Sequence, residues 1–125
     1  MKTKEVEAYL IKEFPDFVID DISQGLPYCV AGDFAHYLLN AYQNNDTDKL
    51  ISAGKFIEDL YTYKNDEIKK LATIGYLEGI QNVWSHYVDP EEMVQYLGEI
   101  SNRWWEKLNR FWNGDKTALS EEVYE

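Results

Sequence analysis

Apolar side chains recur at steps of three and four residues along most of this chain, and this spacing restricts the folds it can adopt. The clearest stretch runs from about Cys29 to Asn44, where the apolar positions are Val30, Phe34, Tyr37, Leu38 and Ala41. Such steps place the side chains on one side of an α-helix, whereas a half-buried strand alternates with a period of two. The stretch therefore predicts a helix that packs one face against a core.

The same spacing predicts further helices over residues 4–14, 46–63, 66–87, 90–97 and 101–113. At 125 residues the chain has the length of one domain, and aromatic residues, which make up 15% of it, supply ample apolar area for one core. We expect an all-α, single-domain bundle of five or six helices over residues 1–114, with residues 66–87 as a long central helix. Residues 115–125 are polar and acidic without clear periodicity, and we expect them to form a frayed tail.

Short local motifs mark where several helices begin and where they approach one another. Residues 89–92, Asp-Pro-Glu-Glu, combine an N-cap, a proline at the first helical position and a glutamate that can complete a capping box. Asn65 is a natural N-cap for the long helix, and Asn45 or Asp46 for the helix before it. Glycines inside predicted helices cost helix propensity, so Gly75 and Gly79 predict a tight helix crossing. Gly54 similarly predicts a close neighbour.

Residues 15–28 interrupt the helical pattern with Pro15, Gly25 and Pro27. We expect an ordered acidic loop here, with the apolar residues 17–19 tucked inward. Cys29, the single cysteine, cannot form an internal disulfide and has no positioned base in view. It is predicted to be a small core residue.

Negative charge is concentrated between residues 13 and 48. This stretch contains seven acids and neither Lys nor Arg, in a chain whose formal net charge is −11. A field of this sign repels phosphate backbones and attracts basic surfaces. The largest basic cluster is Arg103, Lys107 and Arg110, which is too small for a nucleic-acid site and predicts a solvated helix face. We therefore expect a basic protein as partner and exclude nucleic acid.

The sequence also predicts where the protein resides. Residues 1–7 contain both positive and negative side chains and lack the apolar run of a secretory signal. No window approaches the roughly 18 apolar residues of a membrane-spanning helix. Together with the single cysteine, these features predict a cytoplasmic protein without membrane contact.

A few titratable residues form an alternative candidate site. Asp33 and His36 lie three residues apart on one helix and could share a proton or a metal. Bundle metal sites normally draw ligands from several helices, so a surface charge pair is the simpler interpretation and we predict no metal. Glu78 shares a face with apolar residues and is expected to be partly buried, either as a general acid or as a structural hydrogen-bonding group. His86 is expected to interact with the carboxyl end of the long helix.

Residues 32–34 (Gly-Asp-Phe), 75–78 (Gly-Tyr-Leu-Glu) and 104–112 (Trp-Trp-Glu-Lys-Leu-Asn-Arg-Phe-Trp) together resemble a family of small, uncharacterised helical bacterial proteins. The resemblance spans roughly residues 28–114. In size and acidity the chain is similar to the immunity proteins that neutralise intracellular toxins in bacterial competition. The resemblance implies an inhibitory role by analogy and supplies no catalytic residues.

These observations favour a non-enzymatic, acidic binding protein without a cofactor, most specifically an immunity-type inhibitor that occludes a basic protein such as a nuclease toxin. The motifs of the common enzyme classes are absent from the sequence. Two alternatives remain open. The chain could be a metal-binding protein, small-ligand binder or enzyme using the alternative pocket, or a helical adaptor that binds a partner helix. The predicted partner-binding residues are Asp16, Asp20, Asp21, Tyr28, Tyr42, Asp46 and Asp48, and the alternative pocket comprises Asp33, His36, Glu78 and His86.

Overall fold

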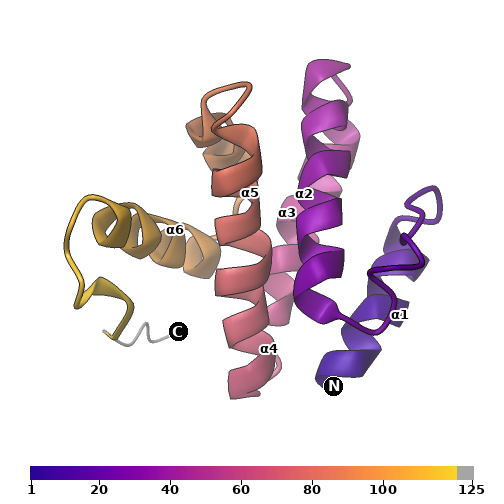
Figure 1. The fold of residues 1–125 in the computed structure, drawn as a ribbon, viewed down its shortest axis with the longest axis horizontal. Coiled ribbons are helices and arrows are strands. Elements are labelled where there is room, and N and C mark those ends of the chain that lie inside the picture. Colours follow the sequence, from indigo (N-terminus) through magenta and orange to yellow (C-terminus); the bar gives the residue numbers. More distant parts are fainter. Residues whose placement is uncertain (121–125) are drawn as a thin grey trace.

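A computed structural model describes residues 1–120. All regular secondary structure in these residues is helical, which confirms the predicted fold class. The elements in chain order are α1 (Thr3–Glu13), α2 (Pro27–Gln43), α3 (Thr47–Leu60), α4 (Asp66–Lys70), the π-helix η1 (Leu71–Leu77), α5 (Glu78–Trp84), the 3₁₀-helix η2 (Pro90–Tyr96), α6 (Glu99–Trp112) and the 3₁₀-helix η3 (Ala118–Ser120). α2 lies in the middle of the bundle, with α1 on one side, α5 on the other and α3 behind it (Figure 1). α6 lies on the side of the α4–α5 run that faces away from α2 (Figure 1).

Aromatic rings form the centre of the core. Phe34 of α2 is fully buried, and its ring centroid lies 4.9 Å from that of Phe14 and 6.0 Å from that of Phe56. Tyr76 of η1 completes the cluster at 5.9 Å from Phe34. Most of these pairs are edge-to-face, the arrangement that aromatic quadrupoles favour. One residue of α2 thus joins α3, η1 and the segment after α1.

The predicted long helix is present as a continuous helical run over residues 66–84, but it is not a regular α-helix. Its middle, η1, is a π-helix. Two residues there are poor α-helix formers: Gly75, and Thr73, whose hydroxyl donates to the Lys69 carbonyl oxygen at 2.9 Å. The run ends at Trp84 rather than near Tyr87. Periodicity alone does not distinguish a π-turn from an α-turn over so few residues.

The glycines mark close contacts between helices, as predicted. A Cβ added at Gly75 would lie 3.3 Å from Ala31 Cβ, and one at Gly79 would lie 3.8 Å from the Ala31 carbonyl oxygen. These two residues therefore allow η1 and α5 to pack along α2. Gly54 is the most constrained, because its Cβ would lie 1.8 Å from the backbone oxygen of Tyr96 in η2.

The predicted helix starts are confirmed at three caps. The Asn65 side chain accepts hydrogen bonds from the Glu67 and Ile68 amides, and Asp46 and Asp89 accept from the Lys49 and Glu91 amides. The segment after Asp89 is nevertheless a 3₁₀-helix rather than an α-helix. The residue at its second helical position, Glu91, accepts a hydrogen bond from Trp105 Nε1 at 2.5 Å, which ties η2 to α6.

Two other predicted starts were placed too late in the chain. α2 begins at Pro27 rather than near Cys29, because proline fits the first turn, where its missing N–H is not needed. α6 begins at Glu99 rather than Ser101. A distant carboxylate caps it, since Glu58 of α3 accepts hydrogen bonds from the Ile100 and Ser101 amides at 3.2 and 2.9 Å.

Part of the expected tail is ordered. Ala118 of η3 is buried, and η3 contacts α6. Arg110 forms an ion pair with Asp115 at 2.6 Å and so holds the start of this segment. Residues 121–125 lie outside the described part of the chain. Within the described part, no helix is long and apolar enough to cross a bilayer.

Replacing Gly54 with Ala is expected to destabilise the fold by roughly 1–3 kcal/mol, because the new methyl group would overlap the Tyr96 backbone. The matched control is Gly32→Ala in α2, where an added Cβ would meet nothing within 4 Å. This control should stabilise the helix by up to about 1 kcal/mol. Urea unfolding followed by circular dichroism measures both changes. Equal effects from the two substitutions would contradict the proposed contact between α3 and η2.

Candidate functional site

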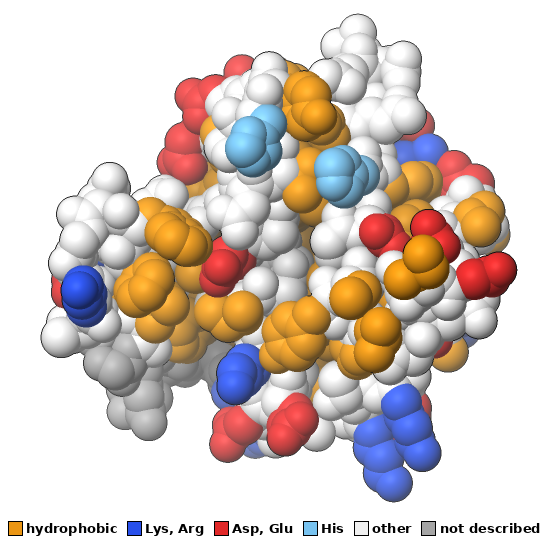
Figure 2. Space-filling view, in the orientation of Figure 1, with side chains coloured by type: hydrophobic (Ala, Val, Ile, Leu, Met, Phe, Trp, Pro, Cys, Tyr) orange, Lys and Arg blue, Asp and Glu red, His pale blue; other side chains and the backbone are white. Residues whose placement is uncertain are grey.

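The loop between α1 and α2, residues 14–26, displays apolar and acidic side chains side by side. Phe17 and Ile19 are buried as expected, but Val18 between them is 84% exposed and Ile22 is 82% exposed. Leu26 is 49% exposed. Figure 2 shows hydrophobic and acidic side chains interleaved over this loop. We call this region the acidic-apolar surface and define it by Val18, Ile22, Leu26, Tyr28, Asp16, Asp20 and Asp21.

Hydrogen bonds from the loop to the helices hold this surface in place. The Ser23 hydroxyl donates to Asp33 of α2 at 2.6 Å, and the Gly25 amide donates to Glu7 of α1 at 3.4 Å. Asp20 accepts from the Ile22 amide at 3.1 Å and so closes a turn. Gly25 has φ +76°, a backbone conformation that glycine adopts without strain. The loop is therefore ordered, as predicted.

Lys49 of α3 is the centre of a small charged cluster at one end of the loop. Its ammonium lies 2.8 Å from an Asp16 oxygen and 3.5 Å from an Asp46 oxygen. The Tyr37 hydroxyl donates to Asp16 at 2.5 Å, and the Lys49 ammonium lies 4.8 Å from the centre of the Tyr37 ring. Two of the predicted partner-binding acids are therefore already engaged within the chain.

This cluster shifts the pKa of its members in a consistent way. Hydrogen bonds from Lys49 and Tyr37 hold the pKa of Asp16 below its usual value. The hydrogen bonds to Asp16 and Tyr37 raise the pKa of Lys49. Burial, followed by the hydrogen bond to Asp16, raises the pKa of Tyr37 to about 12. Asp16 and Lys49 thus both stay charged at neutral pH.

The remaining predicted partner-binding residues fall into two groups. Asp20, Asp21 and Asp48 are exposed, so their charges face solvent. Tyr28, in the first turn of α2, is 45% exposed and adjoins the loop. Tyr42 lies fourteen residues further along α2, roughly 21 Å away at 1.5 Å per residue. Its ring packs on Trp84 at 5.2 Å, so the structure separates it from the acidic-apolar surface.

The alternative pocket residues lie on or beside the neighbouring helices α2 and α5, but no hydrogen bond or ion pair within residues 1–120 joins any two of them. Asp33 bonds to Ser23, and His36 and His86 are exposed. Glu78 is partly buried as expected, and desolvation raises its pKa while a hydrogen bond from Asn82 opposes that shift. In the described chain, no three His, Cys, Asp or Glu side chains gather to hold a metal ion.

The prediction that Cys29 is a core residue is wrong, since its side chain is exposed. In this part of α2 the buried side chains are those of Val30 and Ala31. Sequence reasoning also missed Lys49, which lies just outside the stretch without basic residues. It also missed the exposure of Val18, although the position of Asp20 and Asp21 between Val18 and Ile22 indicated that this loop carries acidic and apolar side chains close together.

Asp16→Asn should lower the free energy of unfolding at pH 7 by about 0.2–1 kcal/mol, because the exposed pair with Lys49 is lost. Because the pKa of Asp16 is lower in the folded chain, its charge contributes fully to the free energy of unfolding above its unfolded pKa of 3.8. This contribution disappears as the pH falls through the folded pKa. Urea unfolding measured from pH 7 downwards should therefore show a difference that shrinks below pH 3.8 and vanishes once the pH is below the folded pKa. Asp21→Asn is the control and should have little effect at either pH. A difference that persists in acid would contradict this origin.

Comparison with known proteins gives one match. Residues 7–113 match the model of a domain of unknown function, DUF7674. No curated protein and no solved structure matches the chain. The matched region extends from within α1 to the residue after α6 and contains the acidic-apolar surface. This agrees with the expected likeness to an uncharacterised helical family. The chain belongs to the DUF7674 family.

Proposed function

We propose that this chain is a non-enzymatic binding protein, an immunity-type inhibitor whose acidic-apolar surface docks on a basic protein such as a nuclease toxin and occludes it. The observation that supports this most is the exposure of Val18 and Ile22, both above 80%, among acids in an ordered loop. Large apolar side chains that protrude together commonly belong to interaction sites. Carboxylates around them select a cationic partner.

The two kinds of side chain have different roles in this proposal. Asp20, Asp21 and Asp48 accelerate the encounter through long-range attraction. Val18, Ile22 and Leu26 lose water on docking and supply most of the affinity, with Tyr28 as an aromatic anchor at the edge. Asp16 and Asp46 contribute less to steering, because Lys49 already offsets their charge.

The order of the loop is a further argument for binding. A flexible loop loses conformational entropy when a partner immobilises it, and this lowers affinity. Here the turn at Asp20, the Ser23–Asp33 bond and the Gly25–Glu7 bond hold the loop before any partner arrives. Occlusion then needs no rearrangement of the helices.

The enzyme or metal alternative has less support. Within residues 1–120 no hydrogen bond or ion pair joins any two of its four residues, and Asp33 accepts a hydrogen bond from Ser23. The helical-adaptor alternative requires an exposed aromatic patch. Among residues 1–120, the most exposed aromatic side chains are those of Tyr87, after α5, and Trp112, at the end of α6. Their ring contacts are with His86 and Phe111 and not with each other.

Affinity capture from the source cell, with the immobilised chain as bait, should recover a basic protein whose association is fast and salt-dependent. The double variant Asp20→Asn/Asp21→Asn should slow association by roughly tenfold at low salt and much less at high salt. Asparagine keeps an oxygen that can accept the Ile22 amide, so the turn is preserved. Stopped-flow fluorescence measures the rates. Capture of an acidic or nucleic-acid partner alone would contradict the proposal.

Ile22→Ser tests the apolar part of the same surface. It should leave the association rate nearly unchanged and raise the dissociation rate, because docking anchors act after encounter. The charge-matched control for the double variant is Asp66→Asn/Glu106→Gln, which removes two exposed acids from α4 and α6. An equal loss of rate in this control would show that net charge, rather than the acidic-apolar surface, governs the encounter.

A further inference from the structure

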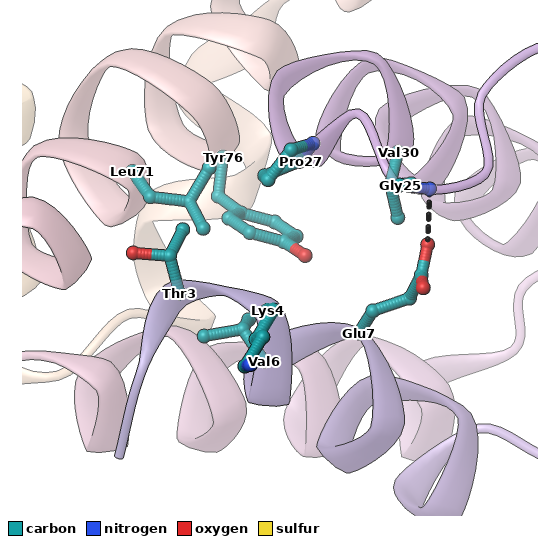
Figure 3. Close-up of a pocket in the computed structure, with 9 residues that line it drawn as sticks. All are labelled: Thr3, Lys4, Val6, Glu7, Gly25, Pro27, Val30, Leu71 and Tyr76. Carbon is teal, nitrogen blue, oxygen red and sulfur yellow. Dashed lines mark hydrogen bonds between the residues drawn. The ribbon is translucent and has the colours of Figure 1, made fainter.

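A pocket of about 220 Å³ lies between the first half of α1, the start of α2 and η1. Its lining residues come from these three elements and from the end of the α1–α2 loop, as Figure 3 shows. Most of the wall is apolar, with Val6 from α1, Val30 from α2 and Leu71 from η1. Pockets for drug-sized ligands have volumes of roughly 300–1,000 Å³, so this one suits a smaller molecule.

Tyr76 brings a hydroxyl into this pocket from the core, whereas the other polar side chains of the lining, Thr3, Lys4 and Glu7, come from α1. Tyr76 is only 2% exposed, and in the close-up its hydroxyl points into the space between α1 and α2 (Figure 3). No hydrogen bond to this hydroxyl exists within residues 1–120. The comparable buried tyrosine, Tyr61, does have a partner, since its hydroxyl lies 2.7 Å from that of Thr73. The hydroxyl oxygen itself is open to the pocket, because the buried side-chain polar atom without a partner in residues 1–120 is Gln81 Oε1 and not this one. A molecule in the pocket can therefore accept the hydrogen bond of Tyr76 in place of water.

The hydroxyl can act as a hydrogen-bond donor at any ordinary pH. Burial, together with the nearby Glu7 carboxylate, raises the pKa of Tyr76. Glu7 itself is engaged at the rim, where it accepts from the Gly25 amide. The pocket therefore offers a donor at the end of an apolar cavity.

We propose that this pocket binds a small, mostly apolar molecule, a single ring or short chain carrying one hydrogen-bond acceptor such as a carbonyl group, with that acceptor on the Tyr76 hydroxyl. An apolar cavity of roughly 150 Å³ is already large enough for a benzene ring. The site is separate from the proposed docking of a basic protein, since none of the residues that define the acidic-apolar surface lines it. Its test therefore stands whether or not that proposal holds.

Acetophenone and ethylbenzene form a matched pair of probes, because they have similar size and differ in the carbonyl group. Titration of the isotopically labelled full chain with each probe, followed by NMR, should shift the methyl resonances of Val6, Val30 and Leu71. Acetophenone should bind more tightly than ethylbenzene by roughly three- to tenfold, the usual worth of one hydrogen bond. No saturable binding of acetophenone, or shifts confined to other residues, would overturn the proposal.

Tyr76→Phe separates the hydrogen bond from the cavity. The variant should bind acetophenone roughly three- to tenfold more weakly and ethylbenzene as before. It should also melt at the same temperature as the native chain or higher, because no hydrogen bond within residues 1–120 is lost with the hydroxyl. A lower melting temperature would show that the hydroxyl already has a partner, and unchanged acetophenone affinity would show that the hydroxyl does not recognise it. Either result would overturn the proposal.

Val30→Leu provides a second, independent variant that adds volume to the pocket wall. It should weaken both probes by similar factors, since it removes space and leaves the donor in place. Circular dichroism checks that the variant is folded. Undiminished binding of both probes to folded Val30→Leu would place them elsewhere and reject the pocket. If this variant does not fold, Tyr76→Phe still decides the question.

Discussion

The burial of Phe34 is the interaction on which the rest of the structure depends. Its ring lies among Phe14, Phe17, Phe56 and Tyr76, and it brings together the segment after α1, α3 and η1. Tightly packed aromatic rings leave little freedom to the helices that carry them. Because Phe14 and Phe17 flank the start of the α1–α2 loop, this cluster also sets where the loop leaves the core.

The loop continues this order to the surface. Phe17 and Ile19 face inward, so Val18 between them must face solvent. Polar contacts then fix the remainder, with Lys49 and Tyr37 at Asp16 and Asp33 at Ser23. The apolar side chains exposed here are thus presented by a supported scaffold. This support is the physical basis for the proposal that the loop is a docking surface and not a solvated linker.

The helix crossings are governed by small residues rather than by large ones. Gly75 and Gly79 let the run from α4 to α5 approach Ala31 and Ala35 of α2, while Gly54 admits the backbone of η2. The close crossing also directs Tyr76 towards the start of α2, where the pocket opens. Packing of the core and the geometry of the pocket therefore have a common origin in the η1–α2 contact.

The sequence by itself determined the helical class, most helix positions and three caps, because periodicity and capping depend on residues close together in the chain. It also indicated the glycine contacts and the partial burial of Glu78. The exposure of Val18 and Cys29, the capture of Asp16 by Lys49 and the separation of Tyr42 from the loop could not be derived in this way. These features, and the pocket around Tyr76, arise from contacts between residues distant in sequence, and only the packing of whole helices decides which side chains meet.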